Sequence, residues 1–191
     1  MITWIGGSPC GGKSTIAGLL ATALGGTVYS CDDRVGRHAA STPGGVLAEL
    51  VSCPVGVRLA RPVERQVVDV LAGYREQFPL IVRDVRAISG PVVVEGAALL
   101  PELVAGAGVP AARAVWLVPT PEFQVRHYER RTWARELLRD VPDPDRAFRR
   151  WMRRDARFAV VVAEQARALG YRVIVVDGSR SAAEVFADLF G

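Results

Sequence analysis

The segment GGSPCGGKST at residues 6–15 decides the fold of this chain of 191 residues. From Gly7 to Ser14 it fits the pattern G-x-x-x-x-G-K-[ST] at every fixed position. An apolar stretch at Ile2–Gly6 precedes it, and a helical pattern at Ser14–Leu24 follows it. Strand, glycine loop and helix in this order predict a loop that binds the phosphates of a nucleoside triphosphate.

The residue types of this loop fit that chemistry. Glycines let backbone N–H groups turn inward around a phosphate, and the following helix points its positive end at the same anion. We expect Lys13 to hold the β- and γ-phosphates and the Ser14 hydroxyl to ligate Mg²⁺. The predicted ATP-binding residues of the loop are Gly7, Ser8, Pro9, Cys10, Gly11, Gly12, Lys13, Ser14 and Thr15. GTP in place of ATP remains open.

Length and composition indicate one globular domain over residues 1–191, since 50% of the residues are hydrophobic and 23% are charged. No apolar run approaches the length of a membrane span, and no secretory leader precedes the first strand. Three cysteines, an odd and small number, fit reduced thiols in a cytoplasmic protein. We interpret Cys10 as a small packing residue. Both a monomer and a homodimer remain open.

Short apolar runs alternate with helical stretches, which predicts an α/β, three-layer P-loop NTPase fold with a five-stranded parallel sheet flanked by helices. The predicted strands are Ile2–Gly6, Thr27–Cys31, Pro91–Glu95, Ala114–Val118 and Arg172–Val176. The predicted helices are Ser14–Leu24, Pro62–Phe78, Glu122–Arg139, Asp145–Leu169 and Ser181–Phe190. Residues 34–90 are expected to leave the sheet and build the acceptor site, and residues 122–157 to form a helical lid.

Carboxylates stand where two of these strands end, and ligands of open parallel sheets bind at that edge. Asp32 and Asp33 follow the second strand, where one of them could accept a proton from an attacking hydroxyl or hold Mg²⁺ through water. A helix cap or exposed turn is the alternative. Glu95 ends the apolar run VVV, so it fits a magnesium-side acid, with a buried salt bridge as the alternative.

Arginines are concentrated between residues 126 and 157, and the chain carries a net charge of +4 with Lys13 as its single lysine. Arg126 and Arg130 would share one helix face, with Arg131 and Arg135 on a neighbouring one. A mobile lid of this kind brings guanidinium groups onto a transferring phosphoryl group. The alternative is a solvated helix paired with its own glutamates. Further along, Arg153 or Arg154 could reach an anionic substrate.

Together these motifs resemble small P-loop small-molecule kinases, most closely the uridine kinase and nicotinamide riboside kinase group. The matching features are GGSPCGGKST at 6–15, YSCDD at 29–33, VVVEGAALL at 92–100, WLVPTPEF at 116–123 with the following Arg130-Arg131, and VIVVDGSRSAAEVF at 173–186. Chloramphenicol phosphotransferase and gluconate kinase share similar loop and aspartate features. The resemblance covers nearly the whole chain.

The resemblance implies roles for individual residues. Asp32 would be the general base and a magnesium-side acid, and Glu95 would contribute to metal and acceptor binding. The acceptor is therefore expected beside Asp32, Asp33 and Glu95, and the metal beside Ser14, Asp32 and Glu95. Lid arginines at Arg126, Arg130 and Arg131 would contact phosphates. The turn Asp177-Gly178-Ser179 would lie by the adenine, which adds Gly178 and Ser179 to the ATP-binding residues.

The predicted activity is ATP-dependent phosphoryl transfer to the hydroxyl of a small molecule, with Lys13, Asp32, Arg130 and Arg131 as catalytic residues. Asp33 is followed by Arg34, where the group usually has an aromatic residue, and residues 34–90 show no nucleoside signature. Nucleoside, sugar and antibiotic-like acceptors therefore all remain open. Two other classes are a nucleotide-gated regulatory ATPase and a kinase acting on nucleic-acid ends, although a small molecule is the expected partner rather than nucleic acid.

Overall fold

Five parallel strands form the centre of the molecule, as the sequence predicts, and the structure gives their order in the sheet as β2-β3-β1-β4-β5. The computed structural model describes all residues from 1 to 191. The strands are β1 (Ile2–Gly7), β2 (Thr27–Ser30), β3 (Val92–Glu95), β4 (Ala114–Pro119) and β5 (Arg172–Val176). This order places the carboxyl ends of β2, β3 and β1 side by side, with β3 in the middle.

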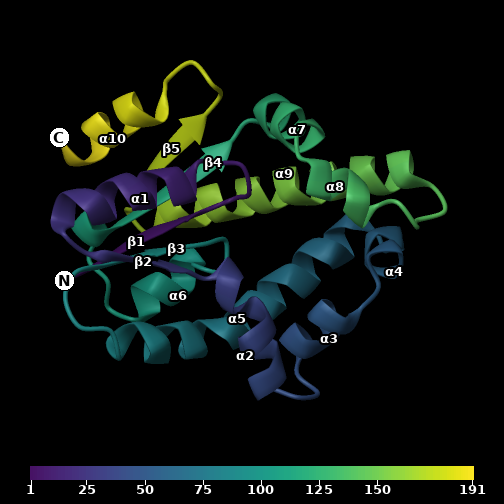
Figure 1. The fold of residues 1–191 in the computed structure, drawn as a ribbon, viewed down its shortest axis with the longest axis horizontal. Helices are drawn as coiled ribbons and strands as arrows, with labels where there is room; N and C mark the ends of the chain where they lie inside the picture. The colour runs from purple at the N-terminus through teal and green to yellow at the C-terminus, as the bar shows by residue number, and fades with distance from the viewer.

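Helices cover both faces of the sheet and give three layers (Figure 1). Helices α1 (Lys13–Leu24) and α10 (Ala182–Phe190) pack together on one face, and Ser181 caps α10 with a capping box. Helices α5 (Val63–Arg86), α6 (Pro101–Gly106) and α9 (Pro144–Ala168) lie on the other. The α/β fold class is therefore confirmed.

Adjacent side chains of β1 divide between the two cores, as the alternation of a strand requires. Trp4 belongs to the larger core with α5 and α9, whereas Ile5 belongs to the core under α1 and α10. All four residues of β3 and all six of β4 are buried, which explains their continuous apolar sequences. None of the helices is long and apolar enough to cross a membrane.

The segment after β2 leaves the sheet through a short turn and three helices before it reaches α5. They are η1 (Asp32–Arg34), α2 (Val35–Ser41), α3 (Val46–Ser52) and α4 (Val55–Ala60). Helix α5 is longer than predicted and passes through Pro79. Pro79 is exposed, whereas Ile81 and Val85 continue the buried face, so packing on the sheet outweighs the hydrogen bond that proline cannot make.

The segment after β4 contains two helices where the sequence predicts one helix over Glu122–Arg139. Helices α7 (Pro121–Glu129) and α8 (Thr132–Leu137) are separated at Arg130 and Arg131, where Arg131 adopts an extended backbone. The turn lets Tyr128 of α7 and Ala134 of α8 join one apolar cluster with Trp151 of α9. Arg131 and Arg135 therefore do not share one helix. This part of the chain and α4 lie at the same end of the molecule (Figure 1).

Candidate active site

The glycine loop between β1 and α1 is held against the end of β4. The Ser8 N–H donates to the Leu117 carbonyl at 3.2 Å. A Cβ added at Gly7 would lie 1.9 Å from the same carbonyl oxygen, and one at Gly11 would lie 2.5 Å from it. Gly7, a fixed position of the motif, and Gly11, a variable one, are thus required by backbone packing, whereas a Cβ at the second fixed glycine, Gly12, would meet nothing within 4 Å.

Two further loop residues have special backbone or side-chain positions. Cys10 has φ 67°, a left-handed conformation that a residue with a Cβ rarely adopts. Its side chain is buried beside Leu59 and Tyr128, in agreement with the interpretation of Cys10 as a packing residue. Gly12, at φ 80°, precedes the first turn of α1. The Lys13 ammonium donates to the Ser8 carbonyl at 2.9 Å and is almost fully buried.

Glu95 lies at the centre of the charged groups. It ends β3 and is paired with Ile5 of β1 on one side and with Ser30 of β2 on the other. Its side chain is 3% exposed, and burial raises the pKa of the carboxyl, with Lys13 opposing the rise and Asp32 adding to it. Glu95 thus ends β3 between the strand that leads into the glycine loop and the strand that leads into Asp32, and both Lys13 and Asp32 act on its carboxyl.

The segment that carries Asp32 is fixed to Glu95 through the backbone. The Cys31 N–H donates to the Glu95 carbonyl at 2.9 Å, and a Cβ at Gly96 would lie 2.5 Å from the Cys31 Cβ. Asp32 and Asp33 then begin η1 with exposed side chains. Glycine after Glu95 is therefore needed so that the two strand ends can approach.

A cavity of about 310 Å³ adjoins the loop. Phe123 and His127 of α7 stack there with ring centroids 4.1 Å apart, and a Cβ at Gly178 would lie 2.8 Å from the Phe123 ring. The N–H and hydroxyl of Ser179 donate to Asp177 at 2.8 and 2.6 Å. The lining residues are Cys10, Gly11, Gly12, Thr15, Ile16, Phe123, His127, Arg131, Val176, Arg180, Ala182 and Val185.

Of the three predicted lid arginines, the structure brings one to this cavity. Arg131 lies over the rings of Tyr128 and Trp133 at 5.4 and 5.7 Å from their centroids. Arg126 and Arg130 are exposed and make no hydrogen bond or ion pair. The sequence did not point to Phe123, His127 or Arg180 as lining residues, because an aromatic pair on a helix has no motif of its own.

A second polar cluster near Asp32 involves side chains of α4, α5 and α9. Tyr74 of α5 is close enough to Asp32 and Arg154 for both to act on its phenol, whose pKa is raised by burial and by Asp32 and lowered by Arg154. Arg58 of α4 is half-buried. Burial and the neighbouring Arg154 lower its pKa, and its Nε is buried without a hydrogen-bond partner. The sequence pointed to Arg154 but gave no signal for Arg58 or Tyr74.

Asp155 connects this cluster to the loop and to α7. Its carboxylate accepts from Arg154 Nε at 2.6 Å and from the Tyr128 hydroxyl at 3.0 Å, and its backbone carbonyl accepts from the Ser8 hydroxyl at 3.3 Å. Asp155 is 2% exposed. Arg154 of the basic segment is thus used inside the protein, in an ion pair with Asp155.

The largest cavity, about 820 Å³, lies between α4 and the connection from α8 to α9. Neither the glycine loop nor the carboxylates at the strand ends line it. Size alone therefore does not mark the reacting centre in this protein.

Comparison with known proteins supports the fold. A shikimate kinase from Acinetobacter baumannii, solved in complex with shikimate, has a TM-score of 0.56 and 14% identity, over 98% of this chain and 89% of that chain. A shikimate kinase from Aquifex aeolicus has a TM-score of 0.48 and 17% identity, over 99% of this chain and 94% of that chain. No family model matches the sequence, and no curated protein matches it. The architecture is that of the P-loop fold of shikimate kinase.

Substitution of Gly11 by alanine tests the packing of the loop. The added Cβ would meet the Leu117 carbonyl, so we expect Gly11→Ala to lose about 1–3 kcal/mol of unfolding free energy and to weaken ATP binding. Gly18→Ala in α1 is the matched control, since its Cβ meets nothing within 4 Å, and we expect it to gain about 0.5–1 kcal/mol. Urea unfolding and titration with a fluorescent ATP analogue measure both. Unchanged ATP affinity in Gly11→Ala would contradict this account.

Glu95→Gln tests the cost of the buried carboxylate. Because the folded-state pKa of Glu95 is raised, its ionisation lowers the unfolding free energy as pH increases from the unfolded value through the folded one. Glutamine stays neutral, so the variant is expected to be more stable than the wild type at pH 7 and equally stable at pH 4, without nucleotide. Urea unfolding at both pH values measures this. A wild type that is more stable at pH 7 would mean that pairing with Lys13 outweighs burial.

Proposed function

We propose that this chain is an ATP-dependent phosphotransferase that moves the γ-phosphate to a hydroxyl of a small molecule. The carrying observation is that Glu95 ends β3 between β1, which leads into the glycine loop and Lys13, and β2, which leads into Asp32. Nucleotide binding alone needs the loop and its lysine. A proton-accepting step also requires a carboxylate that the acceptor can reach, and the exposed Asp32 beside Glu95 is such a group.

Within this proposal, the loop amides and Lys13 hold the phosphates of ATP, with GTP as an open alternative. Magnesium fits the donor set, because Mg²⁺ prefers oxygen ligands and commonly keeps several waters. Ser14 would supply its hydroxyl, and Glu95 and Asp32 would act through water. Bound there, the ion would neutralise charge on the phosphates. The neighbouring Ser14 and Ser30 hydroxyls lower the pKa of Glu95, so its surroundings already favour the ionised form in part.

Asp32 is the better candidate for the base. Its charge raises the pKa of both Glu95 and Tyr74, which lie on different elements. Asp33 makes one contact, in which its N–H donates to the Ser30 hydroxyl at 3.4 Å. Asp32 would orient the acceptor hydroxyl and take its proton while the phosphoryl group is transferred. Asp33 would then contact the acceptor at the edge of its binding site.

The cavity at α7 is the proposed nucleobase site. The stacked Phe123 and His127 offer a flat surface to a base, and Gly178 approaches the Phe123 ring. Gly178 and Ser179 do not line the cavity itself, so their contact with the adenine stays a prediction from the resemblance. Arg131 is the lid arginine best placed to reach phosphate, since it lines the cavity next to Cys10 and Gly11. Arg126 and Arg130 require movement of α7 to take part.

The acceptor is proposed to carry a negative charge in addition to its hydroxyl. Arg58 and Arg154 lie together on the acceptor side of Asp32, and one buried guanidinium nitrogen of Arg58 has no partner. A carboxylate or phosphate on the acceptor would supply that partner. The shikimate bound to the Acinetobacter enzyme is itself a hydroxylated acid, which makes such acids the first compounds to try. The solved structures that resemble this chain are shikimate kinases, so the comparison does not support the uridine kinase and nicotinamide riboside kinase group in particular.

The decisive experiment is a screen of ATP consumption across hydroxy acids, sugars, sugar phosphates, nucleosides and antibiotic-like alcohols, with Lys13→Ala as the blank. With an acceptor in hand, we expect Asp32→Asn to lower kcat by about 10²–10⁴-fold and to leave the Kd for ATP nearly unchanged. Near-normal kcat would remove Asp32 from the base role. Activity that depends on a protein partner alone, or salt-sensitive binding to oligonucleotides, would favour the regulatory ATPase or the nucleic-acid kinase instead.

Arg58→Gln tests the charge of the acceptor. We expect a rise of about 10-fold or more in KM for an acidic acceptor, because a charge-assisted hydrogen bond is lost, and no change in KM for ATP. Arg157→Gln is the control, since Arg157 makes the same charge change from an exposed position on α9. Steady-state kinetics give both constants. Equal KM values for the acceptor in the two variants would argue against an anionic acceptor.

A further inference from the structure

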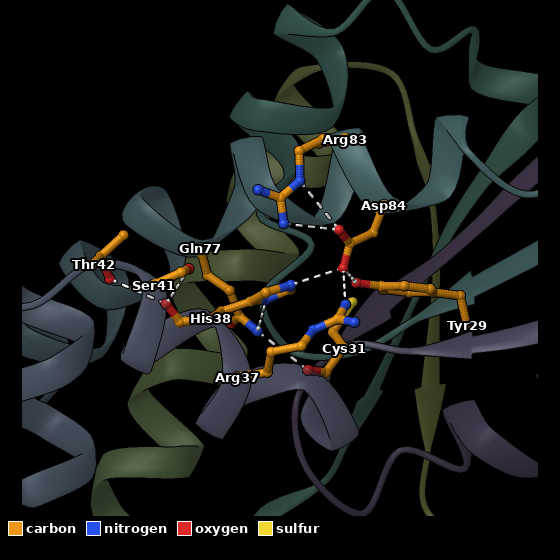
Figure 2. Close-up of polar contacts among 9 residues, drawn as sticks. All are labelled: Tyr29, Cys31, Arg37, His38, Ser41, Thr42, Gln77, Arg83 and Asp84. Carbon is orange, nitrogen blue, oxygen red and sulfur yellow. Dashed lines mark hydrogen bonds and ion pairs between the residues drawn. The ribbon is translucent and has the colours of Figure 1, made fainter.

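A chain of buried polar side chains runs from α5 through α2 to the residue that precedes Asp32 (Figure 2). His38 and Gln77 are both fully buried. His38 Nε2 lies 3.0 Å from Asp84 Oδ2, and His38 Nδ1 lies 3.3 Å from the amide nitrogen of Gln77. The same amide nitrogen donates to the Cys31 carbonyl at 3.1 Å. We call these three side chains, Asp84, His38 and Gln77, the α5–α2 relay.

The hydrogens of the relay have one consistent arrangement. The Gln77 amide nitrogen has two protons, and its two neighbours are the Cys31 carbonyl oxygen and His38 Nδ1. Nδ1 must then accept, so the ring proton lies on Nε2 and is donated to Asp84. If the Gln77 amide were reversed, its oxygen would face the Cys31 carbonyl oxygen, and neither atom could donate a hydrogen bond. Each member therefore fixes the orientation of the next.

Asp84 is the anchor of the relay. Its carboxylate also accepts from the Tyr29 hydroxyl at 3.0 Å and from Arg83 at 3.0 Å, and it is paired with Arg37. Although burial opposes it, hydrogen bonds from His38, Arg83 and Tyr29 hold the pKa of Asp84 well below its usual range. Asp84 thus stays ionised and keeps the proton of His38 on Nε2.

The relay ends at the peptide bond between Cys31 and Asp32. The N–H of Cys31 is bound to the Glu95 carbonyl, and its carbonyl accepts from Gln77 and from the Arg34 N–H at 3.1 Å. The Asp32 carboxylate itself makes no hydrogen bond or ion pair with the rest of the protein. Its position is therefore determined by its backbone, which Glu95 holds on one side and Gln77 on the other.

We propose that Gln77 and His38 are positioning residues that hold Asp32 for proton acceptance. The inference rests on the proposed function and deepens it, because it names residues outside the site on which the base depends. Without the Gln77 amide, the Cys31 carbonyl keeps the Arg34 N–H alone, and His38 Nδ1 is left buried without a donor. The turn that carries Asp32 then has fewer constraints, and catalysis is sensitive to shifts of about 1 Å.

Gln66 shows that burial of a glutamine on α5 does not by itself give this role. It is as buried as Gln77 and also donates to backbone carbonyls, those of Leu59 at 3.3 Å and Arg61 at 2.9 Å. Those carbonyls belong to the end of α4 and the following turn, not to a strand end. Gln66→Met is therefore a control with the same residue change, helix and burial as Gln77→Met.

The first measurement needs no acceptor. Only one cysteine in the chain is followed by aspartate, namely Cys31, since Cys10 precedes Gly11 and Cys53 precedes Pro54. Protein labelled with carbonyl-¹³C cysteine and ¹⁵N aspartate therefore gives a single HNCO peak, from the Cys31 carbonyl and the Asp32 N–H. We expect the carbonyl shift of this peak to move upfield in Gln77→Met, because a hydrogen bond is lost, and to stay in place in Gln66→Met.

The second measurement is turnover, as ADP release from magnesium-ATP with the hydroxy acids of the screen present. We expect Gln77→Met to lower kcat by about 10- to 100-fold with the KM for ATP within twofold, and Gln66→Met to keep kcat within twofold. His38→Asn, whose side-chain oxygen can still accept from Gln77, should retain more kcat than His38→Leu. If Gln77 and His38 were purely structural, all these variants would have a lower Tm. Their kcat values would then not rank Gln66→Met above Gln77→Met and His38→Asn above His38→Leu.

The outcomes separate the inference from the proposed function. An unmoved peak in Gln77→Met, or equal kcat in Gln77→Met and Gln66→Met while Asp32→Asn is inactive, would overturn the positioning role and leave the kinase proposal standing. Full turnover in Asp32→Asn would refute the base itself, and with it any role of the relay in catalysis. A moved peak together with a kcat loss confined to Gln77 and His38 variants would establish the relay.

Discussion

The contact on which the site depends is that between the glycine loop and the Leu117 carbonyl at the end of β4. The Ser8 N–H bonds to this oxygen, and Gly7 and Gly11 approach it so closely that neither position has room for a Cβ. The loop is thereby fixed over the sheet edge before any ligand binds. Its amides and the start of α1 can then face a phosphate without further ordering, which lowers the entropic cost of binding.

Strand order decides which charges meet at that edge. With β3 between β2 and β1, the carboxylate of Glu95 lies between the glycine loop and the turn of Asp32. The arrangement is costly, since burial raises the pKa of Glu95 even beside Lys13. Polar groups that destabilise the empty protein but fit a metal-bound triphosphate are typical of functional sites. The polar chain through Gln77 and His38 adds a constraint from the opposite side.

Much of the site was predictable because it follows from local pattern. The loop from Gly7 to Ser14 is a contiguous motif, and its lysine is the single lysine of the chain. Glu95 was predictable as a carboxylate that ends an apolar strand. The lid was predicted less well, because the break at Arg131 arises from packing of Tyr128 and Ala134 around Trp151, residues far apart in the sequence. Arg58 gave no signal, since its environment is created by α9.

The sequence by itself determined the phosphate loop, the five parallel strands and the carboxylates at their ends, because these depend on neighbouring residues and on periods of two or about 3.6. Tertiary structure alone decided that Arg131 lines the cavity beside the loop, that Ser8 donates to the Asp155 carbonyl and that Gln77 reaches the Cys31 carbonyl. Those contacts join residues up to 147 positions apart, as Ser8 and Asp155 show. No local pattern encodes such pairs, since they exist only once the helices have packed on the sheet.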